Sequence, residues 1–498
     1  MSRTKKFLVN TITAAIYQVV VLGAGIIIPQ IMLLAYGSEV NGLVSSITQF
    51  INYFNLVEAG LAGAAVFALY GPLANKDYKA ISSVLSATQN LYKRSGYIFL
   101  ILLAVFSFIY PMFIESQYLS PVWIGILVLI LGTSGVLEFF TLGKYRAILT
   151  ADQKQYVISI ASIIYQLLMI IIIAVLARLR VNIVITRLLS LVAVYSRSII
   201  LALYTRKKYP FINYNAIPAF EAINKRWDAM FLQILGAIHT GSPIILATIF
   251  TNLLDVSVYS IYNMVLAGIG GVVGIFTSGL SAAFGDVIAK KEYSILKRTY
   301  REFQVLYYSL IVVVYGVTTR MLIPFISLYT KSINDTNYII ESLALLFVIN
   351  GFLHNLKTPQ GMLIISAGHY RETRIQTSVQ GLLAVSVGMA LAPRYGLQGI
   401  LIGSIVSNIY RCIDLMVYVP RNIVHDSANN TAFKMLKSIA VLIILIITTS
   451  KIPFEISTYV DWIISAIMVT IYASIIVIVS DWIFERDEIL GIMKRIFK

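Results

Sequence analysis

The feature that most constrains this chain is a succession of apolar segments, each long enough to cross a lipid bilayer as a helix. A bilayer core is about 30 Å thick and needs roughly 20 mainly apolar residues per helical span. About fourteen such segments can be read from the sequence, at residues 7–34, 41–70, 95–114, 121–142, 156–176, 184–204, 230–250, 256–285, 303–325, 338–356, 377–392, 397–419, 436–450 and 460–483. They predict an all-α polytopic membrane protein with about fourteen transmembrane helices joined by short connections.

The composition agrees with a surface that faces lipid. Hydrophobic residues make up 58% of the chain, and charged residues only 12%. A soluble globular chain is typically about half apolar and about one quarter charged. Charge at half the usual density leaves too few polar side chains to solvate a chain of 498 residues, so most of its surface must face lipid.

The basic excess has two explanations. The formal net charge of +16 would suit a nucleic-acid-binding protein if the basic residues formed a solvent-facing patch. If instead the N-terminus is cytoplasmic and the spans alternate, about 31 basic residues fall on the inner side. Seven fall on the outer side: Arg178, Arg180, Arg187, Arg320, Lys331, Arg394 and Lys451. This asymmetry follows the positive-inside rule, so it predicts two cytoplasmic termini and requires no nucleic acid as partner.

An internal repeat connects the two halves of the chain. The matching pairs are 70–78 with 284–293 (one-residue gap), 148–151 with 364–367, and Arg178 with Arg394. They share an offset of about 216 residues. Six predicted spans separate equivalent positions, and six is even, so the two halves should share one orientation in the membrane. Parallel repeats of this kind occur in secondary transporters, which bind substrate at the repeat interface.

The repeat also predicts the organisation of the chain into two six-helix lobes plus two C-terminal helices. The predicted limits are 1–208 for the N-terminal lobe, 209–228 for a cytoplasmic linker, 229–424 for the C-terminal lobe, and 425–498 for the last two helices and a cytoplasmic tail. The substrate should then bind between the two lobes.

Several motifs resemble those of a known family. They are YGPLA at 70–74, KYRAILTADQK at 144–154, VYSIYN at 258–263, TP at 358–359, AGHYRET at 367–373 and PRYGLQG at 393–399. In this order they resemble the polysaccharide repeat-unit flippases of the multidrug/oligosaccharidyl-lipid/polysaccharide exporter (MOP) superfamily. The resemblance spans almost the whole chain and agrees with the predicted spans and repeat.

The resemblance implies a function. Such a flippase moves an undecaprenyl-diphosphate-linked oligosaccharide from the inner to the outer leaflet of a bacterial cytoplasmic membrane by alternating access. It would serve the export of capsule, exopolysaccharide or cell-wall polysaccharide. Its partners would be the lipid-linked oligosaccharide, membrane lipid, and the polysaccharide polymerase and glycosyltransferases of the same route. No enzymatic activity is expected of it.

One relative in this superfamily, the lipid II flippase, carries basic residues in its first two helices. The equivalent spans here hold Gln18, Gln30, Gln49, Asn52, Asn55 and Glu58. The diphosphate-binding arginines of that relative therefore have no counterparts at these positions. The spans that would carry a sodium site like that of the relative contain Gln233, Gln380 and Asp414, which leaves sodium coupling open.

Basic residues inside spans are the first candidates for binding a diphosphate, because an ionised side chain at mid-bilayer costs about 3 kcal/mol. Arg197 lies inside the sixth predicted span. It could bind the diphosphate, or it could pair with Glu58, Glu138 or a backbone carbonyl and only hold helices together. Lys144 and Arg146 close the fourth predicted span, where they could receive the diphosphate or act as positive-inside anchors.

Three further titratable residues are candidates for transport. Arg320, near the outer end of the ninth predicted span, could contact the substrate on release or simply reach the interface with its long side chain. Glu58 lies deep in the second span and could bind a coupling proton or cation, or form a structural ion pair. His239 in the seventh span could titrate near neutral pH, although a lone histidine is more often a packing residue.

The second predicted span carries one polar stripe. Its members recur every three or four residues: Asn41, Ser45, Ser46, Gln49, Asn52 and Asn55. A stripe facing lipid would be penalised, so the stripe should line a water-filled cavity suited to sugar hydroxyls, and its last three members are the candidate contacts. Tyr259, Tyr262 and Asn263 in the eighth span, at the repeat-equivalent position, could face the same cavity.

Metal or cofactor chemistry has no support in the sequence. Cys412 is the only cysteine, and the four histidines are too scattered for a metal-ligand spacing. Three other functions stay open: a multidrug exporter of the same superfamily, a membrane polysaccharide polymerase or glycosyltransferase, and a non-transporting scaffold. The exporter would favour an acidic, aromatic cavity, and the enzymes would need acidic residues on large extracytoplasmic loops. The scaffold would leave the charges inside the spans unexplained.

Overall fold

A computed structural model describes residues 3–223, 226–277 and 280–496, apart from the side chains of residues 3–5, 7, 226–233, 239, 282 and 496. None of the described residues forms a strand, and the predicted all-α class is confirmed. The chain divides into two compact units, Met1–Gly241 and Ser242–Lys498. The lobe limits expected from the repeat, 1–208 and 229–424, stay predictions.

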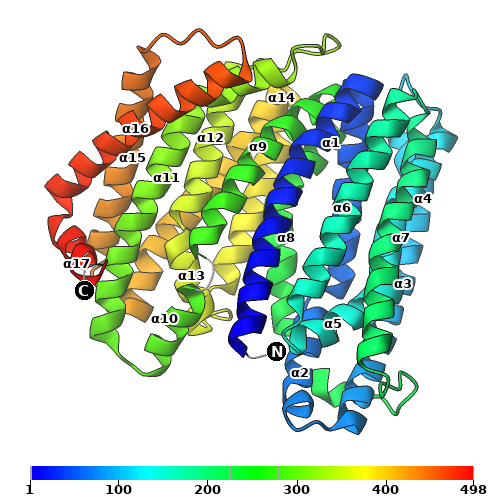
Figure 1. Cartoon of the computed structure of the whole chain (residues 1–498). Helices are drawn as coiled ribbons and strands as arrows, with labels where there is room; N and C mark the ends of the chain where they lie inside the picture. The colour runs from blue at the N-terminus through cyan, green and yellow to red at the C-terminus, as the bar shows by residue number, and fades with distance from the viewer. Residues whose placement is uncertain (1–2, 224–225, 278–279, 497–498) are drawn as a thin grey trace. The chain divides into compact units, whose positions relative to one another are not determined.

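Unit 1 is a bundle of long helices, coloured blue to green in Figure 1. Its elements are α1 (Arg3–Phe54), η1 (Asn55–Glu58), α2 (Leu61–Ala74), α3 (Tyr78–Phe113), α4 (Pro121–Leu137), η2 (Glu138–Leu142), α5 (Gly143–Ala151), α6 (Gln155–Arg178), α7 (Ile183–Lys208), η3 (Phe220–Ile223) and the first part of α8 (Arg226–Phe250). Helix α6 packs between α1 and α7, and α3 packs against α4. The last residue of unit 1, Gly241, lies within α8.

Unit 2 continues with α8 and contains the two C-terminal helices. Its further elements are α9 (Leu253–Thr277), α10 (Leu280–Ala289), α11 (Tyr293–Tyr329), α12 (Glu341–Leu356), α13 (Thr358–Ala367), α14 (Arg374–Val419), η4 (Pro420–Val424), α15 (Ala428–Ser450), α16 (Tyr459–Phe484) and α17 (Arg486–Ile496). Helix α11 is central to this unit, because it packs against α12, α15 and α16. The short helix α17 at the end of the chain also contacts α11.

Ten helices among the described residues are long and apolar enough to cross a membrane. Two of them each cover two predicted spans: α1 with α2, kinked at Gly37 (φ 82°), and α14, kinked at Gly396 (φ 54°). Both glycines have the positive φ that other residues rarely adopt. Helices α8 and α12 coincide with the seventh and tenth predicted spans but fall below this length in their described apolar parts. The chain is a multi-pass membrane protein, and the number of fourteen crossings stays a prediction.

The surface of α16 illustrates how the apolar composition is used. Ile463, Ile467, Ile471 and Ile475 recur every four residues on this helix and are 50%, 55%, 57% and 56% exposed. Residues four apart share one face of an α-helix. Such a face would be costly in water, so it is suited to contact with lipid.

The repeat expected from the sequence is seen in the ends of the helices. Helices α2 and α10 end at Ala74 and Ala289, α3 and α11 begin at Tyr78 and Tyr293, and α5 and α13 end at Ala151 and Ala367. These pairs are separated by 215, 215 and 216 residues, obtained by subtracting the residue numbers. The two units therefore place helix ends at matching positions along the chain.

Left-handed backbone residues recur at the same spacing. The pairs are Lys76 and Lys291 (φ 55° and 57°), Gln153 and Gly368 (φ 56° and 71°), and Arg180 and Gly396 (both φ 54°). A residue with positive φ commonly follows the last turn of a helix, where it reverses the chain. Agreement at three connections supports the repeat independently of side-chain identity, since glycine occupies only some of these positions.

Candidate functional site

The second predicted span is broken near its middle. Helix α1 ends at Phe54, a short 3-10 turn covers Asn55–Glu58, and α2 begins at Leu61. Gly60 makes the break possible, because its φ of 77° is in the left-handed region that a residue without Cβ adopts without strain. The expectation of one continuous helix over 41–70 is therefore wrong at this point. In secondary transporters, interrupted helices of this kind form substrate and ion sites.

A cavity of about 450 Å³ lies at this break, within unit 1. Its polar lining comes from Asn52, Asn55 and Glu58 on one side and Thr240 of α8 on the other. The remaining lining residues are mostly small: Leu56, Ala59, Gly60, Ala62, Gly63, Gly236 and Ala237. We call this cavity the helix-break pocket. It combines amide, hydroxyl and carboxylate groups, which can hydrogen-bond to hydroxyl-rich ligands.

The polar stripe of the second span divides into two parts. Asn41 and Ser46 are buried, and the Tyr110 hydroxyl donates to Ser46 Oγ at 2.8 Å, so this part lies inside the helical bundle. Asn52 and Asn55 instead line the helix-break pocket. A cavity therefore borders the last part of the stripe, and its use for sugar hydroxyls stays a prediction.

Helix α8 is held close to α1 beside this pocket. The Tyr53 hydroxyl donates to the carbonyl of Ala237 at 3.0 Å. Gly241 allows the close approach, because an added Cβ would lie 2.3 Å from Gln49 Nε2 and 2.5 Å from the Tyr53 ring. Gln49 therefore lies against α8, one helical turn before the pocket lining begins.

The carboxyl group of Glu58 is incompletely satisfied. Its Oε2 atom is buried, with no hydrogen-bond partner among the described residues. A buried carboxylate oxygen without a partner is costly, so such a group often marks a site that binds a proton, an ion or a ligand. Glu138 and Arg146 lie near enough to act on this carboxyl electrostatically.

Glu138 joins two of the predicted cations. It begins a π-helical turn between α4 and α5, and it forms ion pairs with Arg146 and, at 3.5 Å, with Arg197. We call these three residues the Glu138 cluster. The Arg197 guanidinium also lies over the Tyr165 ring, 5.1 Å from its centroid. The guanidinium groups retain N–H donors that Glu138 does not use, and such donors suit an anionic ligand.

The accessibility of this cluster is intermediate. The side chain of Arg146 is 47% exposed, whereas those of Arg197 and Glu138 are 22% and 15% exposed. The pairing of Arg197 that the sequence left open is therefore present, and Glu138 is its partner. Pairing does not exclude ligand binding, because a guanidinium has five N–H donors.

The remaining predicted cations are held by neutral partners. Lys144 donates to Gln89 Oε1 at 3.3 Å, and its ammonium lies 4.7 Å from the centroid of the Tyr214 ring. Arg320 in unit 2 donates to the carbonyl of Ile452 at 2.7 Å and lies over the Phe454 ring. Arg320 thus fastens the connection between α15 and α16.

The tyrosines of α9 are not placed as expected. Tyr259 and Tyr262 are 3% and 0% exposed, and both rings pack against Phe347 inside unit 2. The Tyr262 hydroxyl donates to the carbonyl of Tyr338 at 2.8 Å. The hypothesis that these two rings face a water-filled cavity is therefore corrected, since packing against the aromatic core occupies them. Asn263 is only partly buried.

The side chain of His239 lies outside the described residues, so its proposed titration has no structural counterpart here.

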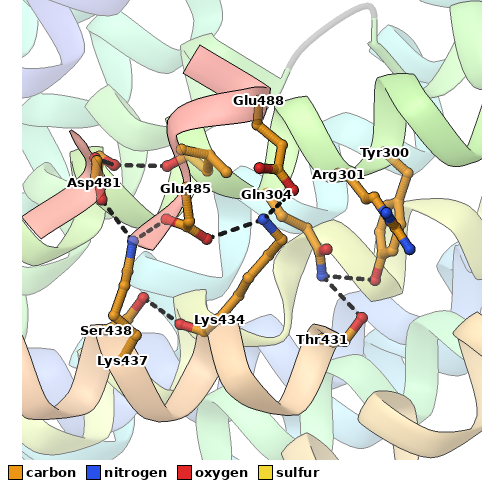
Figure 2. Close-up of polar contacts among 12 residues, drawn as sticks. Tyr300, Arg301, Gln304, Thr431, Lys434, Lys437, Ser438, Asp481, Glu485 and Glu488 are labelled. Carbon is orange, nitrogen blue, oxygen red and sulfur yellow. Dashed lines mark hydrogen bonds and ion pairs between the residues drawn. The ribbon is translucent and has the colours of Figure 1, made fainter. Parts of the chain in front are cut away.

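Unit 2 contains a charged group that the sequence did not single out. Figure 2 shows Lys434 and Lys437 of α15 facing the acidic residues of α16 and α17. Lys434 pairs with Glu485 and Glu488, each at 2.9 Å, and Lys437 pairs with Asp481 at 2.5 Å and with Glu485. We call these five residues the C-terminal ion network. The positive-inside rule accounted for both lysines as anchors, but a signal was present in the acidic residues three and four positions apart.

Helix α11 is joined to the same region by polar contacts. Ser309 Oγ donates to the Asp481 carboxylate. Gln304 Nε2 donates to the hydroxyls of Tyr300 at 2.9 Å and Thr431 at 3.3 Å, as Figure 2 also shows. These contacts fix α15 and α16 to the centre of unit 2.

Two aspartates outside the apolar spans have shifted pKa values. Burial raises the pKa of Asp152, but hydrogen bonds from Lys154 and the Tyr209 hydroxyl outweigh burial and lower it below its usual value. Asp426 likewise has a pKa well below its usual value, because hydrogen bonds from Arg301 and Lys297 outweigh its burial. The Arg301 pair is bidentate, at 2.6 and 2.7 Å. Both aspartates anchor connections between helices.

Comparison with known proteins identifies solved structures with the same fold. No family model and no curated protein matches the sequence. A solved structure of the lipid II flippase MurJ in an inward closed conformation covers 97% of this chain and 100% of its own, with a TM-score of 0.72 and 13% identity. The chain has the MOP fold. The resemblance inferred from the sequence motifs is thereby confirmed at the level of the fold.

Transporters with the MOP fold are also similar to this chain. An inward-facing multidrug resistance transporter of the MATE family covers 81% of this chain and 95% of its own, with a TM-score of 0.66 and 15% identity. A MOP superfamily transporter from Pyrococcus furiosus covers 85% and 95%, with a TM-score of 0.56 and 12% identity. At these identities the similarity concerns the fold, and the function must be argued from the site.

Proposed function

We propose that this chain is a flippase that moves undecaprenyl-diphosphate-linked oligosaccharide repeat units from the inner to the outer leaflet by alternating access. It would act in a bacterial cytoplasmic membrane, with both termini in the cytoplasm, for the export of capsule or related polysaccharide. The observation that carries the proposal is the helix-break pocket beside the Glu138 cluster in unit 1. Amide and hydroxyl groups suit sugar hydroxyls, and guanidinium groups with unused N–H donors suit a diphosphate.

The residues divide into two roles. Arg146 and Arg197 would bind the diphosphate, since each can donate to phosphate oxygens while it remains bonded to Glu138. Asn52 and Asn55 would hydrogen-bond to sugar hydroxyls in the pocket. A flippase of this kind performs no bond chemistry, so these groups need only bind and release.

The remaining candidates take supporting roles in the proposal. Lys144, at the cytoplasmic end of the fourth predicted span, would attract the lipid diphosphate. Arg320, near the outer end of the ninth predicted span, would contact the substrate on release. Glu58 would bind the coupling proton or cation, because its unpartnered oxygen can accept either. Glycosyltransferases would supply the lipid-linked substrate, and a polysaccharide polymerase would consume it.

A leaflet assay tests the proposal. Purified protein in liposomes is given labelled undecaprenyl-diphosphate-oligosaccharide, and the label that becomes accessible on the far leaflet is measured. Wild-type protein should raise the rate above that of empty liposomes. Arg197→Ala should lower it by about 10- to 100-fold, since a hydrogen bond to a charged group contributes about 1.5–3 kcal/mol. Equal rates with and without protein would refute the flippase function.

The matched control lies on the same helix. Arg206→Ala removes one guanidinium near the exposed end of α7, outside the Glu138 cluster, and should leave the rate unchanged. Melting curves in detergent establish that each variant is folded. If Arg206→Ala and Arg197→Ala lower the rate equally, the diphosphate role of Arg197 is wrong, whatever the wild type transports.

A multidrug exporter is the second candidate. The unpartnered carboxylate oxygen of Glu58 in a pocket favours it, because an organic cation could pair with that group. The same liposomes loaded with ethidium distinguish the two functions. Efflux of ethidium that is lost in Glu58→Gln, without transfer of the lipid-linked sugar, would favour the exporter.

A further inference from the structure

A second pocket in unit 1 shares no lining residue with the helix-break pocket or the Glu138 cluster. It has a volume of about 700 Å³ and is formed by α1, the connection before α4, the end of α6 and the start of α7. Its floor is apolar and includes Leu119, Ala177 and Ile183, which are 6%, 8% and 2% exposed. Its rim carries Arg178 and Arg180, both exposed. We call it the α6–α7 pocket.

The two rim arginines are not used to hold the fold together. Within the described part of the chain, neither guanidinium forms an ion pair with a carboxylate. The nearby carboxylate of Glu39 is engaged elsewhere, because it accepts hydrogen bonds from Ser116 Oγ at 2.5 Å and from the backbone N–H of Gln117 at 2.8 Å. Two unpaired cations therefore border an apolar cavity.

The backbone does not require an arginine at position 180. Arg180 has a φ of 54°, a left-handed conformation that favours glycine, and the repeat-equivalent position is Gly396, with the same φ. The turn is held by other groups: Val181 N–H donates to the carbonyl of Leu176 at 3.0 Å, and the Tyr36 hydroxyl donates to the carbonyl of Val181 at 2.9 Å. The fold of this turn therefore does not depend on the guanidinium group of Arg180.

The position along the helices also matters. Arg178 is the last residue of α6, a 24-residue apolar helix, so the rim lies at the end of a membrane span. The proposed orientation places seven basic residues outside. Three of them, Arg178, Arg180 and Arg187, lie within residues 178–187. Orientation charge belongs on the cytoplasmic side, so it does not explain this concentration.

We propose that the α6–α7 pocket binds the phosphate headgroup of a membrane lipid, with Arg178 and Arg180 on the phosphate and an acyl chain on the apolar floor. Basic pockets between transmembrane helices bind anionic headgroups, because guanidinium groups pair with phosphate while the apolar wall receives the chain. The exposed side chain of Asn182, at the start of α7, adds a polar group to the lining. The site is separate from the Glu138 cluster and does not depend on the transported substrate.

The test uses the intact purified protein and native mass spectrometry. The protein is incubated with palmitoyl-oleoyl phosphatidylglycerol or with the matching phosphatidylcholine. The number of lipid molecules bound per protein is compared between the two lipids. The wild type should prefer the anionic lipid. The double variant Arg178→Ala, Arg180→Gly should bind it about 10- to 30-fold more weakly, from about 1 kcal/mol for each basic residue. Glycine suits the left-handed backbone, so this substitution should not lower the melting temperature.

The control removes the same charge from the other end of α7. Lys207→Ala, Lys208→Ala takes away two exposed cations and should leave the phosphatidylglycerol preference intact. An equal loss in both double variants would overturn the site in favour of a general effect of net charge. Full binding in the Arg178→Ala, Arg180→Gly variant would overturn it directly.

A competition experiment distinguishes a lipid headgroup from free phosphate as the ligand of the pocket. Inorganic pyrophosphate should displace the lipid only at high concentration, because it lacks the acyl chain that the apolar floor receives. If pyrophosphate binds the wild type as tightly as phosphatidylglycerol does, the pocket is a site for free phosphate and the lipid proposal is wrong.

Discussion

The Glu138 cluster of unit 1 and the C-terminal ion network of unit 2 use the same chemistry in opposite ways. In the network, Lys434 and Glu485 are 5% and 2% exposed, and Lys437 is 8% exposed. Two ammonium groups face three carboxylates there, and each lysine has two acidic partners. In the cluster, two guanidinium groups share one carboxylate, and Arg146 is 47% exposed.

The difference indicates which charges are free to act on a ligand. Buried charges that satisfy one another hold helices in place, and removing one of them leaves an uncompensated charge. The network therefore fixes α15, α16 and α17 together. The cluster has spare donors beside a pocket and an unpartnered Glu58 oxygen, so a ligand can complete it. This contrast supports the ligand-binding role proposed for Arg146 and Arg197.

The largest expected effect breaks the closed network. Lys437→Met leaves the carboxylates of Asp481 and Glu485 buried without one of their cations. The free energy of unfolding should fall by about 3–5 kcal/mol, the usual cost of removing one partner of a buried pair. Thermal unfolding in detergent measures it. Lys290→Ala is the control, because its pair with Asp286 is exposed and its removal should leave the stability almost unchanged.

If Lys437→Met unfolds like the wild type, the C-terminal ion network does not stabilise the C-terminal helices. The anchoring role that distinguishes it from the Glu138 cluster is then wrong.

The second prediction concerns the open cluster. Glu138→Gln removes the shared carboxylate and leaves Arg146 and Arg197 without their acidic partner. Transport should fall by about tenfold or more through loss of positioning, while stability falls by only about 1–2 kcal/mol because the Arg146 side chain is 47% exposed. The leaflet assay and thermal unfolding are compared on the same sample.

Glu485→Gln is the counterpart in the network. It should lower stability more than Glu138→Gln does, while the folded fraction transports at the wild-type rate. If the two variants change both quantities in the same proportion, the division into a binding cluster and an anchoring network is wrong.

How well the sequence predicts each of these regions depends on how far apart along the chain the interacting residues lie. Apolar runs determine helices locally, and the repeat predicts where matching helix ends lie, as the equivalent starts of α3 and α11 demonstrate. The break after Phe54 was missed, because small residues such as Ala59 and Gly63 are equally at home in a continuous membrane helix. The pair of Arg197 with Glu138 joins residues 59 apart, so only tertiary packing could select it from the alternatives.

A smaller change in stability is expected at Gly60, and it tests whether the helix break beside the helix-break pocket requires a left-handed residue. Gly60 has a φ of 77°, so Gly60→Ala should cost about 1–2 kcal/mol. Gly25→Ala is the matched control in α1, since its added Cβ meets nothing within 4 Å. It should stabilise the helix by about 0.5–1 kcal/mol. Equal melting temperatures for the two variants would mean that the left-handed residue at the break is not required.

The smallest effect concerns the pH dependence of a closed ion pair outside the spans. The pKa of Asp426 is lower in the folded chain than the usual value of about 3.9, so its pairs with Arg301 and Lys297 stabilise the fold above that pH. This contribution is lost as the pH falls through the lower folded pKa. Asp426→Asn should therefore cost about 1 kcal/mol at neutral pH, because Arg301 and Lys297 are partly exposed and screened by solvent. Its melting temperature should approach that of the wild type as the pH is lowered from about 5 to about 2. A difference that stays constant over this range would mean that the charge of Asp426 is not what stabilises the connection between α14 and α15.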